Sequence, residues 1–545
     1  MNSSPLTKST KSMSAHKMSM IVAAMILALF NQSLWQEVVS LSVDDTLLSW
    51  LFPISLFFIF FLALNIIITL FAWPGLFKPV VVTLIIISVM ASYFIDTYGV
   101  MINRDMVRNL FQTDVREASD LISLGMITHL IIWGAVPAFL IIKQPISYQP
   151  WFKNSIHKSV IVAICSALIV TMIYSGFKQY SIFLRNHRHL RHLLTPANII
   201  YNSTSLLKKI YFNTPKELQR VGLDAQAGDL LQNLGKKSLF VLVVGETARA
   251  DHFSLQGYER ETNPELKKAD GIYFSNVSSC GTATATSLPC MFSANGRRSF
   301  SNEKARHTEG LLDIMQRAGV RVVWLDNNSG CKGACDRVEH EDISQKDGDE
   351  LCKNGTCFDE ILNVRLEEIL KTANGPLLVV LHQLGSHGPA YFKRYPDSFK
   401  RFTPTCDKAQ IENCPQQNII NTYDNTLLYT DAVLADLIKL LKQNSKKYDS
   451  AMLYISDHGE SLGENGIYLH GLPYSIAPSA QTHVPMYVWL SKAFANNMKL
   501  NTNCTISKKS LPFSHDNLFH TMLGIMDVKT SSYKKNLDIF EDCRK

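Results

Sequence analysis

The sequence predicts an α-helical membrane domain of five transmembrane helices, followed by an α/β domain with a mostly parallel sheet. Apolar runs dominate the chain up to about residue 177, and strand-like and helix-like segments alternate from about residue 238 onward. All cysteines except Cys165 lie in this second part. A chain of 545 residues also exceeds the usual size of one hydrophobic core. We therefore expect a membrane domain (1–177), a linker (178–237) and an α/β domain (238–545).

Five apolar segments are candidates to cross a hydrocarbon core of about 30 Å, which needs roughly 20 apolar residues. Buried core helices are the alternative, but a run such as Leu51–Phe71 is too continuously apolar for a helix of a soluble core. No small-residue cleavage site follows the first run, so we do not expect a cleaved signal peptide. The predicted spans are about Met18–Val38, Leu51–Trp73, Pro79–Phe94, Leu121–Ile142 and Val160–Phe177.

Lysines in the short loops predict the orientation of the spans. Lysine and arginine concentrate on the cytoplasmic side of a membrane. The loop after the first span carries Glu37, Asp44 and Asp45 and no lysine or arginine. A cytoplasmic N-terminus and five spans then place the C-terminal part outside. The lysines that support this orientation are Lys8, Lys11, Lys17, Lys78, Lys143, Lys153 and Lys158.

The ten cysteines of the second part fall in close sequence pairs, which is typical of a disulfide framework in an exported domain. A zinc site made of the four cysteines between 331 and 357 is the alternative. Their spacings are wider than C-x₂-C, and an oxidising compartment would consume the thiols. Sequence order suggests the pairs Cys280–Cys290, Cys331–Cys335, Cys352–Cys357, Cys406–Cys414 and Cys504–Cys543.

Strand-helix alternation after the linker predicts the parallel sheet. The strand-like runs are nearly continuously apolar, as strands covered on both faces should be. The linker mixes apolar, aromatic and basic residues at helical spacing, which suits either membrane-surface helices or a solvated connection. The expected strands are Ser238–Val244, Val320–Leu325, Leu377–Leu381, Ala451–Ile455 and Val484–Leu490, and the expected helices are Gly310–Ala318, Phe358–Lys371 and Asn421–Gln443.

The charge balance argues against nucleic acid as a partner. The formal net charge of +7 is modest for this length and is spread along the chain. No lysine- or arginine-rich block occurs, and such a block is the usual signature of a nucleic-acid-binding surface.

Carboxylates and imidazoles follow the predicted strands directly. Glu246, His382 and the pair Asp457-His458 lie where open α/β sheets bind ligands. Mixed oxygen and nitrogen donors suit Zn²⁺, which can activate a hydroxyl nucleophile such as that of Thr284. A helix beginning near Thr284 would also favour a bound phosphate. Each of these residues also has a purely structural interpretation when it is taken alone. Thr284 could be a helix N-cap, Asp457-His458-Gly459 a turn, and Glu246 a carboxylate in the first turn of a helix.

Four stretches of the chain resemble the lipid A phosphoethanolamine transferases, which include the mobile colistin resistance enzymes and lie within the alkaline phosphatase/sulfatase superfamily. The resemblance covers nearly the whole chain, and its motifs are long and specific. The stretches are Val244–Arg249, Ser279–Thr284, His387–Pro389 and Ser456–Gly466.

The resemblance implies a role for several side chains. It implies one tightly bound Zn²⁺ held by Glu246, Thr284, Asp457 and His458, with Thr284 as the nucleophile. It also implies that His387 and His470 contact the donor phosphate or a second zinc, and that Lys332 lies near the substrate. Asn109, Thr113 and Glu117 resemble residues placed over the ethanolamine headgroup, whereas their spacing of four alone indicates one face of an amphipathic helix.

The resemblance also implies the reaction and its location. The donor would be phosphatidylethanolamine and the acceptor lipid A, in a monomeric protein of the bacterial inner membrane with a periplasmic catalytic domain. Masking lipid A phosphates would then confer polymyxin resistance. The alternatives are transfer to lipopolysaccharide core or another periplasmic glycan, a lipoteichoic acid synthase-like glycerol phosphate transferase, and a non-enzymatic anchored binding protein. A sulfatase is disfavoured, because no C/S-x-P/A-x-R stretch surrounds Thr284.

Overall fold

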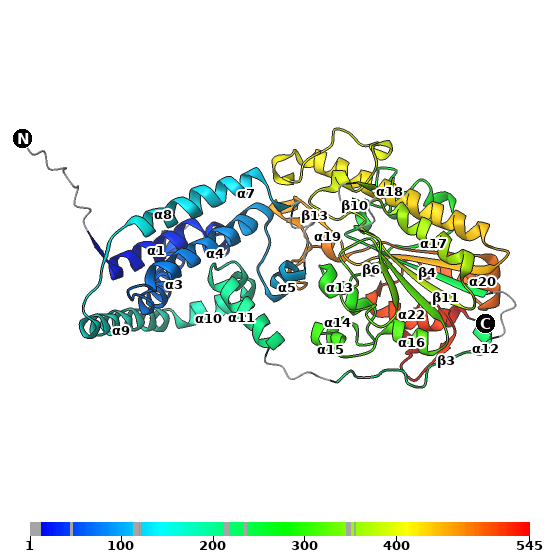
Figure 1. The fold of residues 1–545 in the computed structure, drawn as a ribbon, viewed down its shortest axis with the longest axis horizontal. Coiled ribbons are helices and arrows are strands. Elements are labelled where there is room, and N and C mark those ends of the chain that lie inside the picture. The colour runs from blue at the N-terminus through cyan, green and yellow to red at the C-terminus, as the bar shows by residue number, and fades with distance from the viewer. Residues whose placement is uncertain are drawn as a thin grey trace, which may run out of the picture. The chain divides into compact units, whose positions relative to one another are not determined.

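The computed structural model describes residues 12–43, 47–112, 119, 121–211, 217–232, 237–344, 350–353 and 356–544. The chain divides into two compact units (Figure 1). The first, here the helical unit, comprises Met1–Val107 and Ile122–Phe212. The second, here the α/β unit, comprises Arg108–Leu121 and Asn213–Lys545.

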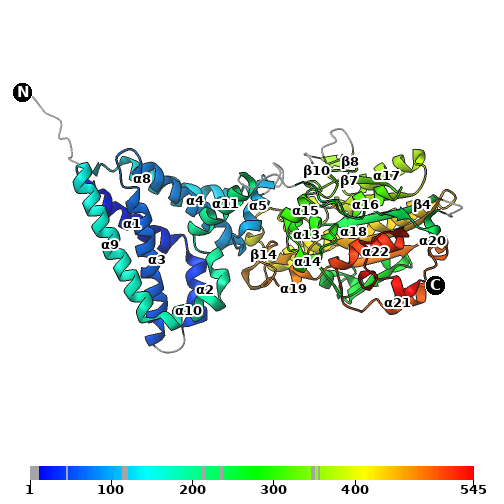
Figure 2. The same ribbon diagram turned by 90° about the horizontal axis from the view of Figure 1, so that it is seen from below.

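The described part of the helical unit contains four helical segments long and apolar enough to cross a membrane, or up to five if one bent pair counts as a span. Helix α3 packs against both α1 and α9 (Figure 2). The four segments are α3 (Leu51–Leu70), α4 (Phe77–Tyr98), the continuous run of α7 (Leu124–His129), η2 (Leu130–Ala135) and α8 (Val136–Lys143), and α9 (Trp151–Ser175).

The predicted first span, Met18–Val38, is not one straight helix. It consists of α1 (Ala15–Leu29) and α2 (Gln32–Ser42), which meet at an angle of 66°. The Asn31 side chain explains the break, because its amide donates to the carbonyls of Ile26 (3.1 Å) and Thr195 (3.0 Å) and its oxygen accepts the Thr195 N–H (2.8 Å). A side chain that bonds to backbone groups in this way competes with the helical hydrogen bonds.

The predicted linker is divided between the two units. Helices α10 (Phe177–Asn186) and α11 (Ala197–Tyr211) belong to the helical unit. Strand β3 (Gln226–Ala227) pairs with β17 (Val528–Lys529), so this later part of the linker belongs to the α/β unit.

A seven-stranded sheet forms the centre of the α/β unit, in the order β5-β15-β12-β4-β11-β7-β8. The strands from β12 to β8 pair in parallel, whereas β15 is antiparallel to both of its neighbours. This arrangement confirms the predicted mostly parallel sheet. The strands are β4 (Lys237–Gly245), β5 (Ile272–Phe274), β7 (Arg321–Asp326), β8 (Glu339–Asp342), β11 (Leu377–His382), β12 (Tyr448–Ser456) and β15 (Met486–Leu490).

Helices cover both faces of this sheet (Figure 1). On one face α16 (Leu311–Arg317) packs against α22 (Leu518–Ile525), and their apolar side chains share a core with Phe240, Leu242 and Val244 of β4. On the other face α18 (Gln416–Gln443) contacts β12 and α17 (Glu360–Thr372). The central strands are buried along nearly their whole length, which accounts for their continuously apolar sequences.

The structure pairs the ten cysteines of the α/β unit in the predicted sequence order. Cys165 is free and buried, as expected for an apolar packing residue. The alternative of a four-cysteine zinc site is therefore wrong, because Cys331–Cys335 and Cys352–Cys357 are disulfides.

Candidate active site

The carboxyl ends of β4 and β12 bring Glu246, Asp457 and His458 together. The two strands are parallel neighbours with Gly245 opposite Ser456, so the next residue of each strand emerges at the same edge. One donor atom from each of Glu246, Asp457 and His458 lies within 4.8 Å of the others, and all three side chains are buried. The predicted strand-end donors thus form one cluster.

Thr284 joins this cluster from the start of helix α13 (Thr284–Met291). Its Oγ1 lies 3.1 Å from Glu246 Oε2 and 3.3 Å from His458 Nε2. Ala283 is the N-cap, and its carbonyl accepts the N–H groups of Thr286 (3.0 Å) and Ser287 (2.8 Å). Thr284 is therefore the first residue of the helix, where the positive end of the helix dipole favours an anion.

The hydrogen bonds of His458 and Asp457 leave donor atoms available for a cation. His458 Nδ1 lies 2.9 Å from the Gly459 carbonyl, so it carries the proton and the Nε2 lone pair faces the carboxylates. Asp457 Oδ1 accepts from the backbone N–H of His458 (2.7 Å) and of Thr247 (3.3 Å). The buried Asp457 Oδ2 has no hydrogen-bond donor among the described residues.

Burial and like charge make the cluster unfavourable without a cation. Burial and then the Glu246 charge raise the pKa of Asp457 well above its usual range. Burial lowers the pKa of His458 well below its usual value, so the imidazole is neutral. Two adjacent carboxylates, a neutral imidazole and a hydroxyl fit the ligand preferences of Zn²⁺. The residues present therefore suit the metal that the sequence predicts.

Asn328 holds the Glu246 carboxylate in place through a hydrogen bond. Its Nδ2 donates to Glu246 Oε2 (2.8 Å) and to the Gln383 carbonyl (2.9 Å). Asp326 in turn accepts the Asn328 N–H (2.9 Å) and pairs with His382 Nδ1 (2.9 Å). Although burial opposes it, the interaction with His382 lowers the pKa of Asp326 to about 2. His382, a predicted strand-end residue, thus belongs to the support of the cluster.

His515 ties α13 to the end of β12. Its Nε2 donates to the Ser456 carbonyl (3.0 Å), and its Nδ1 accepts the Cys280 N–H (3.0 Å). Ser287 Oγ donates to the Asp457 carbonyl (2.5 Å), which adds a second link between the helix and the strand end. These bonds fix the position of Thr284 relative to Asp457.

Two further predicted histidines lie beside His458. The ring centroid of His470 is 4.4 Å from that of His458 and 5.8 Å from that of His387. His470 Nδ1 pairs with Glu460 Oε2 (2.8 Å), and Glu460 Oε1 accepts the Tyr391 hydroxyl (2.6 Å). Burial alone would lower the pKa of His470, but the Glu460 carboxylate outweighs it and raises this pKa above its usual value.

Of the remaining predicted residues, the structure describes Lys332 and Asn109. Lys332 is partly exposed on the loop closed by Cys331–Cys335, and its Nζ donates to the carbonyl (2.6 Å) and hydroxyl (2.8 Å) of Ser329. Asn109 lies on α5 (Arg104–Gln112), as a helical pattern predicts. Thr113 and Glu117 lie outside the described residues.

Three residues of the site were not predicted from the sequence. Glu460 lies inside the stretch Ser456–Gly466, which drew attention for other residues, and the available signal for Asn328 was its place two residues after the end of β7. His515 has no local signal, because its partners Cys280 and Ser456 are 235 and 59 residues away.

Comparison with known proteins identifies the family. A family model described as phosphoethanolamine transferase EptA/EptB matches residues 60–211, and one described as sulfatase matches residues 238–528. Phosphoethanolamine transferase EptA of Salmonella typhimurium is 44% identical over 497 residues, which is 90% of each chain. The chain belongs to the phosphoethanolamine transferase family.

Other members of the phosphoethanolamine transferase family match both units. Phosphatidylethanolamine transferase Mcr-1 of Escherichia coli is 38% identical over 89% of this chain and 90% of its own length. The integral membrane protein lipooligosaccharide phosphoethanolamine transferase A of Neisseria meningitidis superposes with a TM-score of 0.94 at 35% identity, over 98% of this chain and 100% of that one. The predicted family and its sulfatase-like fold are confirmed.

Proposed function

We propose that this chain transfers phosphoethanolamine from phosphatidylethanolamine to phosphate groups of lipid A through a covalent intermediate on Thr284. The observation that carries the proposal is the Thr284 hydroxyl, which lies at the first turn of α13 within 3.3 Å of both Glu246 and His458. The relatives are phosphoethanolamine transferases by name, which supports the identity of the transferred group.

Glu246, Thr284, Asp457 and His458 are the residues that would hold Zn²⁺. When bound, Zn²⁺ would lower the pKa of the Thr284 hydroxyl and offset negative charge on the transferred phosphoryl group. Asn328 and the Gly459 carbonyl orient Glu246 and His458 for this purpose. Asp457 Oδ2, buried and without a donor among the described residues, is the oxygen that most needs a cation.

In the first half-reaction, Thr284 Oγ1 gives up its proton to water, from which His470 can be reprotonated, and attacks the phosphorus of phosphatidylethanolamine. A bond between Thr284 Oγ1 and phosphorus forms, and the bond between phosphorus and the glycerol oxygen breaks. The leaving oxygen takes up a proton and departs as diacylglycerol. His470, which pairs with Glu460 beside His458, would donate that proton.

In the second half-reaction, a phosphate oxygen of lipid A attacks the same phosphorus and the bond between phosphorus and Thr284 Oγ1 breaks. Oγ1 takes up a proton from water, which restores the Thr284 hydroxyl. Lys332, His387 and His470 would bind the non-bridging oxygens, where charge develops in phosphoryl transfer. The product carries an ammonium next to each modified phosphate, so fewer anionic sites remain for cationic peptides such as polymyxin. Asn109, Thr113 and Glu117 would bind the ethanolamine headgroup.

We also propose an inner-membrane location with a cytoplasmic N-terminus and a periplasmic α/β unit. The loop lysines support this orientation. The five disulfides agree with it, because such bonds form and persist in oxidising compartments. The same proposal treats the monomer as the active form.

Mass spectrometry of lipid A tests the proposed function. Cells that express the wild-type chain should gain phosphoethanolamine on lipid A, and cells that express Thr284→Ala should lose this gain by a factor of about 10³ or more. Thr286→Ala is the matched control, because Thr286 lies on the same helix two residues beyond the nucleophile. Unmodified lipid A together with modified core glycan would show that the core glycan is the acceptor. Phosphoethanolamine found on another residue of Thr284→Ala would exclude Thr284 as the nucleophile.

A further inference from the structure

Helix α13, which begins with the candidate nucleophile, contains a proline in its interior. In a regular α-helix each carbonyl accepts the backbone N–H four residues later. Pro289 has no N–H, and its ring crowds the carbonyl of Ala285. This carbonyl, one residue beyond Thr284, therefore loses its regular hydrogen-bond donor. The first turn of α13 then needs another partner to hold it.

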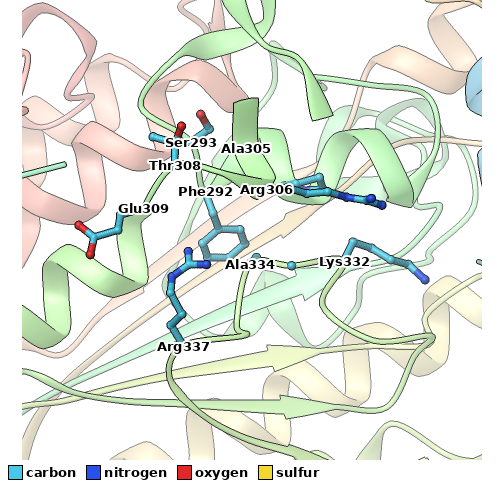
Figure 3. A pocket seen from close by; sticks show the side chains of 12 residues that line it. Phe292, Ser293, Ala305, Arg306, Thr308, Glu309, Lys332, Ala334 and Arg337 are labelled. Carbon is cyan, nitrogen blue, oxygen red and sulfur yellow. The ribbon is translucent and has the colours of Figure 1, made fainter. Parts of the chain in front are cut away.

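Asn302 supplies the missing donor. It is the first residue of α15 (Asn302–Arg306), which contacts α13. The far ends of the two helices line one small pocket through Phe292, the C-cap of α13, and Arg306 of α15 (Figure 3). Asn302 Nδ2 donates to the Ala285 carbonyl (3.0 Å). A side-chain amide thus replaces the backbone N–H that the proline lacks.

Arg108 sets the orientation of this amide. Its Nη1 donates to Asn302 Oδ1. The reversed amide would turn its N–H groups toward the guanidinium and its oxygen toward the Ala285 carbonyl, so both hydrogen bonds would be lost. It would keep a 3.5 Å contact with Thr286 Oγ1. The positive guanidinium also polarises the amide, which strengthens the bond that the amide donates.

Both members of this chain of hydrogen bonds are fixed in the α/β unit. Arg108 is only 8% exposed, and α5 belongs to this unit from Arg108 onward. Asn302 follows Ser301, the N-cap of α15, whose Oγ accepts the Lys304 N–H (3.2 Å). The next residue of α5 is Asn109, one of the proposed ligands of the ethanolamine headgroup. The chain therefore connects a segment proposed to bind the donor with the helix that carries the nucleophile.

We propose that Asn302, oriented by Arg108, is a positioning residue that holds the first turn of α13 and so directs Thr284 Oγ1 at the phosphorus of the donor. This inference rests on the proposed function, in which Thr284 is the nucleophile. Asn302 acts through the Ala285 carbonyl and does not touch the transferred group. A small misplacement of a reacting atom slows the chemical step strongly. Loss of this link therefore lowers the rate at saturating donor rather than the affinity for the donor.

The first half-reaction of full-length protein in detergent tests the inference. Asn302→Ala should release diacylglycerol at saturating phosphatidylethanolamine about tenfold more slowly than wild type, with KM within about twofold and zinc content unchanged. Asn302→Asp should be slowed as much, because it still pairs with Arg108 but cannot donate to the carbonyl. Arg108→Met should be slowed about threefold, since the amide loses the partner that orients it. Asn295→Ala is the matched control, because Asn295 is exposed and contacts the neighbouring Ser293.

A rescue experiment distinguishes positioning from a general loss of packing. Pro289→Ala restores a backbone N–H, so the helix can satisfy the Ala285 carbonyl without Asn302. In this background Asn302→Ala should slow diacylglycerol release by less than about twofold relative to Pro289→Ala alone. An unchanged rate in Asn302→Asp or Arg108→Met, or a defect of equal size in both backgrounds, would overturn the inference. Failure of the wild-type chain to form any covalent intermediate would instead reject the proposed function.

Discussion

The candidate active site has two sides that are held in different ways. On the strand side, Glu246, Asp457 and His458 directly follow parallel strands, and their supporting bonds go mainly to backbone groups and to Asn328. On the loop side, Lys332 and His470 lie in loops, and their partners are Ser329 and Glu460. A rigid sheet edge suits fixed metal geometry, whereas loops suit a substrate that must enter and leave.

The neighbouring histidines His458 and His470 show how the two sides differ in protonation. His458 bonds to a carbonyl and has a strongly lowered pKa, so its free nitrogen can bind a metal. His470 bonds to the carboxylate of Glu460 and has a raised pKa, so it favours the protonated state. The ring centroids are only 4.4 Å apart, yet burial keeps His458 neutral whereas the Glu460 carboxylate favours protonated His470.

The largest effect is expected from Asp457→Asn. Replacing this carboxylate removes a charged donor from the strand side, so we expect zinc to be lost and activity to fall by about 10³ or more. Metal analysis of purified protein together with lipid A mass spectrometry measures both changes. Asp397→Asn is the control, because Asp397 is an exposed aspartate of η8 (Asp397–Phe399). Normal zinc content in Asp457→Asn would show that the strand side does not need this carboxylate to hold the metal.

Asn328→Ala should weaken metal binding on the strand side without removing a metal ligand. Loss of the 2.8 Å bond to Glu246 leaves that carboxylate less well oriented. Changes to such supporting residues cost about 10- to 100-fold in metal affinity. Competition with a zinc chelator measures the affinity, and an unchanged value would show that the backbone alone orients Glu246.

The link through His515 should make the strand side sensitive to acid. Burial lowers the pKa of His515 to about 3, below the value of about 6.5 expected in the unfolded chain. Its stability contribution is therefore present above pH 6.5 and is lost as the pH falls toward 3. Between pH 7.5 and pH 5 this loss amounts to about 2 kcal/mol.

Thermal unfolding of the full-length protein in detergent tests the acid sensitivity. His515→Gln should unfold at a lower temperature than wild type at pH 7.5 and should lose less on acidification. The same substitution at His340, which is exposed, should leave the pH dependence intact. An equal pH dependence in wild type and His515→Gln would assign the acid sensitivity to other groups.

The smallest effect is expected on the loop side, from Cys331→Ser combined with Cys335→Ser. Opening this disulfide frees the loop that carries Lys332. We expect a roughly two- to fivefold higher KM for phosphatidylethanolamine with zinc content unchanged, because the substrate must then order the loop. A loss of zinc in this variant would show that the two sides are not independent.

The residues at strand ends were predictable from the sequence, whereas the hydrogen bonds that reach the site from distant parts of the chain were not. Continuous apolar runs located β4, β7, β11, β12 and β15, and a polar residue after a strand pointed to the site. The edge strands β5 and β8 escaped notice, because one has only 3 residues and the other, Glu339–Asp342, is wholly polar. Pattern reasoning depends on burial, which edge strands lack on one side.

The first helix was misread for a related reason. Asn31 opens the polar stretch Asn31-Gln32-Ser33 inside the predicted span, and the bend also depends on Thr195, a partner that no local window contains. His515 and Glu460 illustrate the same limit inside the site, since each acts through residues brought close only by the fold. Only the family resemblance gave expected roles for Lys332, His387 and His470, because residue patterns alone left them undecided.

The bend at Asn31 sets an order on biosynthesis. Its amide is satisfied in part by Thr195, which lies 164 residues later in the chain. At synthesis rates of about 5–20 residues per second, roughly ten to thirty seconds separate the two residues at the ribosome. During that interval the first helix must enter the membrane with this amide only partly satisfied. The bend therefore reaches its final form only after the last span has been made. The first helix to be synthesised is thus among the last to reach its final conformation.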